Sequence, residues 1–223
     1  MVQGDPVMYG KRTVILADGD FPREEEAFSI LKNAERIVCC DGAAVSLCKA
    51  GLLPDVIIGD LDSLPAELKE RFSHRLIHVR EQETNDLTKA FNYCREQHWE
   101  KICILGATGK REDHTLGNLS LLSEYSLVEK DIMIVTNYGT FTVADSPCEI
   151  PSVPGQQISI VALDPGVQVT ARNLKYPMEK LLLKRWWQAT LNEALSESFS
   201  LDFESGKQLL IFRQHVRNGN GKK

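Results

Sequence analysis

The sequence predicts an α/β protein, in which a Rossmann-like parallel sheet with helices on both faces precedes a smaller β domain. From about residue 13 to residue 135, short and wholly apolar strands alternate with helices, which is typical of a parallel sheet covered on both faces. After Thr140 the strands become short and alternating, with Pro and Gly between them, which favours a small β-sandwich or barrel. We therefore expect two domains, residues 1–142 and 143–223, and the chain is long enough for both.

Four strands and two helices are expected before residue 80. The first helix begins at about Pro22, and the second covers residues 43–50 and ends at Gly51. The apolar face of the first helix consists of Ala27, Ile30, Leu31 and Ala34. The strands are expected at Thr13–Ala17, Arg36–Cys40, Val56–Ile58 and Leu76–Val79.

Residues 85–99 show the clearest amphipathic helix of the chain, with Thr84 or Asn85 as its cap. Apolar residues recur along it with helical spacing, at Leu87, Ala90, Phe91 and Cys94. A second helix is expected through Leu116, Leu119 and Leu122. The remaining strands are expected at 101–105 and 131–135, and in the β domain at 158–163, 167–170 and 209–212.

Composition excludes several classes of protein. A net charge of −5 argues against nucleic-acid binding, which usually requires a basic surface. The six cysteines form no C-x-x-C pair, which argues against a zinc site. No apolar run is long enough to span a membrane, and residues 1–12 lack the apolar core of a signal peptide. We expect a cytoplasmic protein that binds neither membrane nor nucleic acid.

Polar segments follow five of the expected strands, at the point where each strand ends. Ligands of open parallel sheets bind beyond the carboxyl ends of the strands, so these segments should converge on one rim. They are residues 18–20, 41–44, 59–63, 82–86 and 106–114. Asp18 and Asp20 in the first segment either belong to the site or shape a turn.

Asp60 and Asp62 directly follow an apolar strand and Gly59. Residues two apart in an extended segment project to the same side, and two such carboxylates repel each other unless a cation joins them. A hard cation such as Mg²⁺, held together with substrate phosphates, explains the pair. Asp86 would complete the oxygen ligands. Alternatively, Asp62 or Ser63 caps a helix that begins near Pro65.

Other polar residues in these segments have two interpretations each. Asp41 either caps the following helix or contacts a ligand, and Lys89 is either a solvated helix charge or a phosphate contact. Residues 106–114 do not match a P-loop, although a Gly-rich turn before a helix presents backbone N–H groups to phosphate and Arg111 adds a bidentate contact. His114 is either a base or a structural neighbour of a capping Asp113.

Taken together, these segments resemble the thiamine pyrophosphokinase family. The matching stretches, in the order of the family, are residues 41–44, 54–63, 84–90, 106–118 and 173–177. The resemblance implies transfer of a pyrophosphoryl group from ATP to the hydroxyl of thiamine, which yields thiamine diphosphate and AMP. It also implies that the second domain is a β-sandwich and that the protein is a homodimer with active sites between subunits.

The resemblance further implies a role for each matching residue. Asp60, Asp62 and Asp86 would hold Mg²⁺ on the phosphates of ATP, the co-substrate, and Arg111 would join them as a catalytic group. The residues that it implies around ATP are Asp41, Gln82, Thr84, Lys89, Gly106, Gly109, Arg111, Asp113 and His114. No strong base is required, because such transfers depend mainly on positioning and charge neutralisation.

The β domain, which would bind the acceptor thiamine, departs from the family pattern. A Ser-Asn-Glu-like segment is usual there, and the nearest match is residues 190–193, with Leu191 in the Ser position. The implied thiamine contacts are Asn192, Glu193 and Trp187; Trp186 and Trp187 either stack on the thiazolium or pyrimidine ring or divide between core and surface. Alternatives are a pyrophosphokinase for another alcohol, such as a pterin, or a non-catalytic sensor of thiamine and nucleotide.

Overall fold

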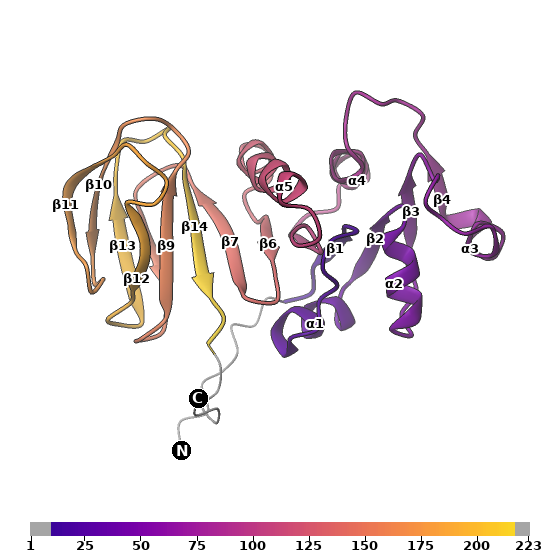
Figure 1. The fold of residues 1–223 in the computed structure, drawn as a ribbon, viewed down its shortest axis with the longest axis horizontal. Helices are drawn as coiled ribbons and strands as arrows, with labels where there is room; N and C mark the ends of the chain where they lie inside the picture. The colour runs from indigo at the N-terminus through magenta and orange to yellow at the C-terminus, as the bar shows by residue number, and fades with distance from the viewer. Residues whose placement is uncertain (1–9, 217–223) are drawn as a thin grey trace, which may run out of the picture. The chain divides into compact units, whose positions relative to one another are not determined.

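The computed structural model describes residues 10–216, and these divide into two compact units between Asn137 and Tyr138 (Figure 1). Residues 1–9, within the stretch for which we expected no signal peptide, lie outside the described part. Among the described residues, no helix is both long and apolar enough to cross a membrane.

The N-terminal unit contains six parallel strands in the order β6-β5-β1-β2-β3-β4. This arrangement confirms the expected Rossmann-like sheet. The strands are β1 (Thr13–Leu16), β2 (Arg36–Cys40), β3 (Val56–Gly59), β4 (Leu76–His78), β5 (Ile102–Leu105) and β6 (Met133–Val135). The helices are α1 (Glu25–Lys32), α2 (Ala43–Lys49), α3 (Ala66–Arg71), the 3₁₀ turn η1 (Ser73–Arg75), α4 (Asp86–Glu96) and α5 (Glu112–Tyr125).

The helices cover both faces of this sheet. Val14 and Leu16 of β1 pack with the apolar faces of α1 and α2 in one hydrophobic cluster. Helices α4 and α5 lie on the other side (Figure 1), where α4 packs on β1, β2 and β3. Strands β1, β3 and β5 are buried along their length, because both faces of the sheet are covered there, whereas the edge strand β4 is partly exposed.

Two helix boundaries differ from those expected. Helix α1 begins at Glu25 rather than at Pro22, because the side-chain oxygen of Asn137 accepts the N–H groups of Arg23 and Glu24 and Glu24 is extended. Helix α4 ends at Glu96 rather than at Trp99. His98 adopts a φ of 55°, in the left-handed region, so the helix cannot continue through it.

The C-terminal unit is a β-sandwich, as the resemblance implied. Its two antiparallel sheets run β12-β9-β14-β7 and β11-β10-β13-β8, and Ile158, Ile160, Val169 and Phe199 belong to the core between them. The strands are β7 (Gly139–Ala144), β8 (Cys148–Pro151), β9 (Gln157–Ala162), β10 (Val167–Arg172), β11 (Met178–Leu183), β12 (Ala189–Glu193), β13 (Ser198–Asp202) and β14 (Leu209–Gln214).

Candidate active site

Asp41, Asp60 and Asp86 are brought together around the end of β3. Asp41 follows β2, Asp60 follows β3, and Asp86 opens α4. Gly59 lies between them, since a Cβ atom there would lie 3.0 Å from Cβ of Asp41 and 3.2 Å from Oδ1 of Asp86. A glycine at the end of β3 therefore lets two carboxyl-bearing residues approach the strand closely.

Asp41 is almost completely buried, with 4% of its surface exposed. Its Oδ2 atom accepts hydrogen bonds from the N–H and the hydroxyl of Ser63, at 3.1 and 2.7 Å. Its Oδ1 atom is buried and has no hydrogen-bond partner within residues 10–216. Asp41 does not cap α2, which has no side-chain cap. An unpaired buried acceptor is costly, and a bound cation would satisfy it.

Asp60 and Asp62 do not lie in an extended segment, contrary to expectation. Leu61 between them has a φ of 64° and is buried in the core, so the backbone is in the left-handed region there and not extended. As a result, the N–H of Asp62 donates to Oδ1 of Asp60 at 3.1 Å. This hydrogen bond is the main reason why the pKa of Asp60 lies below its usual range, with a further contribution from the amide of Gln82. Neither Asp62 nor Ser63 caps α3.

Lys89 is buried and paired, so the solvated interpretation of this residue is wrong. Only 6% of its surface is exposed, and its Nζ atom lies 3.2 Å from Oδ1 of Asp86. Burial raises the pKa of Asp86, Lys89 opposes that rise, and the nearby negative charges of Asp60 and Asp41 add to it. The negative charges of the neighbouring carboxylates therefore raise the pKa of Asp86, and the buried ammonium group of Lys89 lowers it.

These side chains fit a hard cation in their chemistry. Asp41, Asp60 and Asp86 offer carboxylate oxygens, and one of those oxygens is buried without a donor. Within residues 10–216, however, no three His, Cys, Asp or Glu side chains are already arranged as ligands of one ion. The metal therefore stays a prediction.

A second group of predicted residues lies on the loops after β1 and β5. The N–H groups of Gly19 and Asp20 donate to the carbonyls of Gly106 and Thr108, at 2.7 and 2.8 Å. Gly109 has a φ of 80°, and a Cβ atom there would lie 2.3 Å from Cγ of Asp20. The two loops are thus joined by their backbones, and Asp20 packs directly on Gly109.

Arg111 and Asp113 form an exposed ion pair at the start of α5. Nε and Nη2 of Arg111 contact the two carboxylate oxygens of Asp113, at 3.0 and 2.5 Å. This pair, together with the N–H of His114, lowers the pKa of Asp113 to about 2. Asp113 is not the helix cap, which is Arg111 itself, and His114 is exposed. Asp113 therefore orients the guanidinium group of Arg111.

The loop that carries Gln82 and Thr84 is organised by Glu81, which the sequence did not single out. The carboxylate of Glu81 accepts the N–H groups of Glu83 and Thr84, at 2.8 and 3.0 Å, and also the hydroxyl of Thr84. These bonds lower the pKa of Glu81. The hydroxyl of Thr84 is thus already engaged.

The predicted thiamine residues lie on and near β12 in the C-terminal unit. Asn192 is buried, and its side-chain amide pairs with the N–H and carbonyl of Tyr176, at 3.0 and 2.8 Å. Glu193 accepts from Lys175 at 3.1 Å. Trp186 and Trp187 are both exposed, so the alternative in which they divide between core and surface is wrong. Asn192 holds the backbone, whereas Trp187 is accessible.

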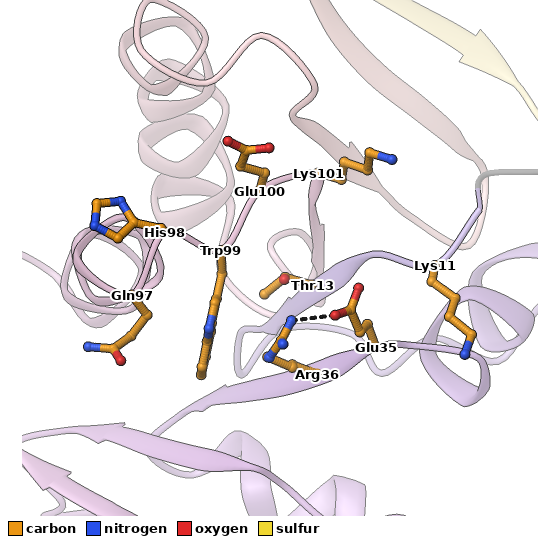
Figure 2. Close-up of a pocket in the computed structure, with 9 residues that line it drawn as sticks. All are labelled: Lys11, Thr13, Glu35, Arg36, Gln97, His98, Trp99, Glu100 and Lys101. Atoms are coloured by element: carbon orange, nitrogen blue, oxygen red, sulfur yellow. Dashed lines mark hydrogen bonds and ion pairs between the residues drawn. The ribbon is translucent and has the colours of Figure 1, made fainter.

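A hollow of about 570 Å³ lies elsewhere, at the amino ends of β1, β2 and β5 (Figure 2). The guanidinium group of Arg36 lies 5.0 Å from the ring centre of Trp99 and is paired with Glu35. The residues around it include none that the sequence predicted for the site. Since ligands of parallel sheets bind at the opposite ends of the strands, the carboxylate cluster defines the candidate site.

Two family models match successive parts of the chain. "Thiamin pyrophosphokinase, catalytic domain" matches residues 28–136, and "Thiamin pyrophosphokinase, substrate-binding domain" matches residues 139–212. The chain belongs to the thiamin pyrophosphokinase family. The two matches divide at almost the same point as the two compact units.

Relatives support the family assignment both in sequence and in fold. The thiamine pyrophosphokinase of Bacillus subtilis (strain 168) is 36% identical over 98 residues, which are 42% of this chain and 45% of the relative. The alignment therefore spans less than half of that relative. The crystal structure of thiamin pyrophosphokinase from Geobacillus thermodenitrificans superposes with a TM-score of 0.76 and 26% identity, over 92% of this chain and 98% of that one. Thiamin pyrophosphokinase from Candida albicans, 18% identical over 94% of this chain and 91% of that one, shares the fold with a TM-score of 0.77.

Three residues with structural roles in this thiamin pyrophosphokinase domain were not among those predicted for the site. Ser63 lies inside a matching segment, where the sequence offered it only as an alternative helix cap. Glu81 precedes Gln82 without any distinguishing pattern. Tyr125, at the end of α5, contacts Thr88 of α4, and no local sequence signal points to it.

Proposed function

We propose that the protein is a thiamine pyrophosphokinase, which transfers the pyrophosphoryl group of ATP to the hydroxyl of thiamine and releases AMP. The observation that carries the proposal is the cluster of Asp41, Asp60, Asp86 and Lys89 at the carboxyl end of β3, in a chain that matches both domains of the family. Such a cluster of oxygen ligands suits phosphate chemistry.

Asp60, Asp62 and Asp86 would hold Mg²⁺, and Asp41 would offer its unpaired oxygen to the same region. The ion, when bound, would neutralise charge on the transferred phosphates. Asp62 is the exposed member of this set, and its N–H already orients Asp60. Its carboxylate is therefore left for the ion or its water shell.

Lys89 and Arg111 would contribute positive charge to the phosphates. Lys89 forms an ion pair with Asp86, and Arg111 forms an ion pair with Asp113, which fixes the orientation of its guanidinium group. A guanidinium group in a fixed orientation suits bidentate contact with phosphate oxygens. Gln82, Thr84, Gly106, Gly109 and His114 would complete the surroundings of ATP.

Thiamine would be recognised by the C-terminal unit, in a cytoplasmic homodimer with active sites between subunits. Trp187, with 73% of its surface exposed, is available to stack on a cationic ring. Glu193, together with the Tyr176 backbone that Asn192 holds, would contribute further contacts to thiamine. The side chain of Asn192 would act indirectly, because Tyr176 occupies both of its polar atoms.

The test is coupled AMP release by the purified protein with ATP and Mg²⁺, with and without thiamine. Thiamine-dependent AMP and an equal amount of thiamine diphosphate are expected. Asp60→Asn and Asp62→Asn should each lower turnover by at least about a hundredfold, because each removes an anionic oxygen from the phosphate region. AMP release only with another alcohol, such as a pterin, would change the acceptor. Binding of thiamine and ATP without turnover would favour a sensor.

A further inference from the structure

The contact between α4 and α5 contains a hydrogen bond in a largely apolar setting. Tyr125, the last residue of α5, is 4% exposed, and its ring stacks on Phe91 of α4 with centres 3.9 Å apart. Its hydroxyl lies 2.8 Å from Oγ1 of Thr88. The hydroxyl thus adds a polar contact between the two helices to the stacking of the rings.

The direction of this hydrogen bond follows from the neighbouring contacts. Oδ1 of Asn85, the cap of α4, is an acceptor only and lies 3.0 Å from Oγ1 of Thr88. Thr88 has one hydroxyl proton and gives it to Asn85, so the hydroxyl of Tyr125 must donate to Thr88. Donated bonds in series strengthen one another. The N–H of Thr88 also donates to Oδ1 of Asn85, at 2.9 Å.

These hydrogen bonds form a relay from Tyr125 through Thr88 to Asn85. The relay ends at the first turn of α4, which carries two residues of the candidate site. Asp86 directly follows the cap, and Lys89 directly follows Thr88. Their ion pair therefore lies on the turn whose cap Tyr125 supports from α5. Removing the hydroxyl of Tyr125 would leave Thr88 with one partner fewer and would loosen that turn.

We propose that Tyr125 is a positioning residue, which fixes Asp86 and Lys89 at the candidate site through Thr88 and the cap of α4. The expected effect on turnover rests on the proposed function, whereas the expected effect on the order of the first turn of α4 does not. It requires no contact between Tyr125 and a substrate.

Tyr125→Phe is the direct test, because it keeps the ring and the stacking on Phe91. We expect turnover to fall about three- to tenfold, the loss typical of one hydrogen bond, and the Mg²⁺ concentration for half-maximal activity to rise. The KM for thiamine should not change. Amide hydrogen exchange at Thr88 and Lys89 should become faster by a similar factor.

Tyr93→Phe is the matched control, since Tyr93 lies on the same helix and makes an edge contact with Trp99, at 5.5 Å between ring centres. This variant should leave turnover, Mg²⁺ dependence and exchange at Thr88 unchanged. Thr88→Val should be at least as severe as Tyr125→Phe, because it also removes the hydroxyl that donates to Asn85. Thr88→Ser should lie closer to the wild type, and Tyr125→Phe with Thr88→Val should be no worse than Thr88→Val alone.

The two readouts separate this proposal from the proposed function. Unchanged exchange at Thr88 and Lys89 in Tyr125→Phe would overturn the positioning role, whatever the kinetics show. If the wild-type protein has no pyrophosphokinase activity, the exchange measurement still decides the role of Tyr125. Additive effects of Tyr125→Phe and Thr88→Val would also overturn it, because independent contributions would mean that no relay exists.

Discussion

Lys89 is buried and paired with Asp86, and its removal would leave that partly buried carboxylate without its ion-pair partner. We predict that Lys89→Met lowers the free energy of unfolding by about 1–2 kcal/mol, less than for a fully buried pair because the side chain of Asp86 is 34% exposed. Mg²⁺ should raise the melting temperature of the variant more than that of the wild type. Differential scanning fluorimetry with and without Mg²⁺ measures both effects.

An equal response of Lys89→Met and the wild type to Mg²⁺ would contradict this prediction. Lys69→Met is a suitable control, since Lys69 lies in the last turn of α3 and takes part in no recorded ion pair within the described residues. It should change neither stability nor the response to Mg²⁺.

The six cysteines differ in their expected reactivity. Burial raises the pKa values of Cys94 and Cys103 to about 12, and it also raises those of Cys39 and Cys40. Cys48 and Cys148 are only partly buried. A thiol reagent should therefore modify two thiols of the native protein rapidly and the other four only on unfolding. Fast reaction of more than two would contradict the packing of the sheet.

The same groups predict a loss of stability at alkaline pH. Their pKa values in the folded protein lie above the unfolded value near 9, so their contribution is complete below pH 9. It is lost as the pH rises from about 9 towards 12, because the unfolded chain releases these protons first. The urea midpoint should accordingly fall between pH 9 and pH 11, and substitution of Cys103 by Ala should reduce that dependence.

At the level of single residues, the sequence predicted which side chains belong to the candidate site better than it predicted what those side chains contact. Asp60 and Asp86 were predicted as partners from the charge pattern, and the structure brings them together. Asp41 and Lys89 were ambiguous, because whether a charged residue is buried depends on elements distant in the chain. Ser63 and Tyr125 act on other side chains rather than on a ligand, and such roles leave no spacing pattern.

Among the elements, β3 determines how closely Asp41 and Asp86 can approach, because its last residue is Gly59. We predict that Gly59→Ala lowers turnover more than tenfold, because its methyl group would displace Asp41 or Asp86 and the φ of 156° is unfavourable for alanine. Stability should fall by about 1–2 kcal/mol. Steady-state kinetics and urea unfolding give the two values.

Gly117→Ala is the matched control for that variant. Gly117 lies within α5, and a Cβ atom there meets nothing within 4 Å. Alanine should stabilise the helix by about 0.5–1 kcal/mol and leave turnover unchanged. A larger loss of turnover in Gly117→Ala than in Gly59→Ala would show that the crowding at β3 does not matter.

Element types were predictable from periodicity, but ends and loop geometry were not. The start of α1 depends on Asn137, more than a hundred residues away, which binds the N–H groups before the helix. The left-handed backbone at Leu61 is accompanied by burial of its side chain in the core. Neither partner lies in the local window from which a helix or strand is predicted.

For the whole molecule, the resemblance predicts a homodimer. The native mass should be about twice the 25.0 kDa of the chain. Light scattering after size-exclusion chromatography measures this mass. Because association stabilises the folded state by mass action, the melting temperature should also rise with protein concentration. A monomer at micromolar concentration, with full activity, would contradict active sites between subunits.

The overall architecture was the most predictable level. Continuous apolar strands between helices identified the parallel sheet, since only strands covered on both faces can be apolar throughout. The β domain was less determined, because short alternating strands suit a sandwich and a barrel equally. The resemblance, rather than the periodicity, selected the sandwich that the structure contains.

The position of β1 in the middle of the sheet has a consequence for synthesis on the ribosome. Thr13 pairs with Arg36 on one side and with Ile102 on the other. At a typical elongation rate, about 5 to 20 seconds separate the emergence of β1 from that of β5. During that interval β1 presents an unpaired apolar edge, on which another nascent chain can add. The newly made protein therefore stays open to aggregation until β5 emerges, even though the loops that carry Asp41, Asp60 and Asp86 have already been made.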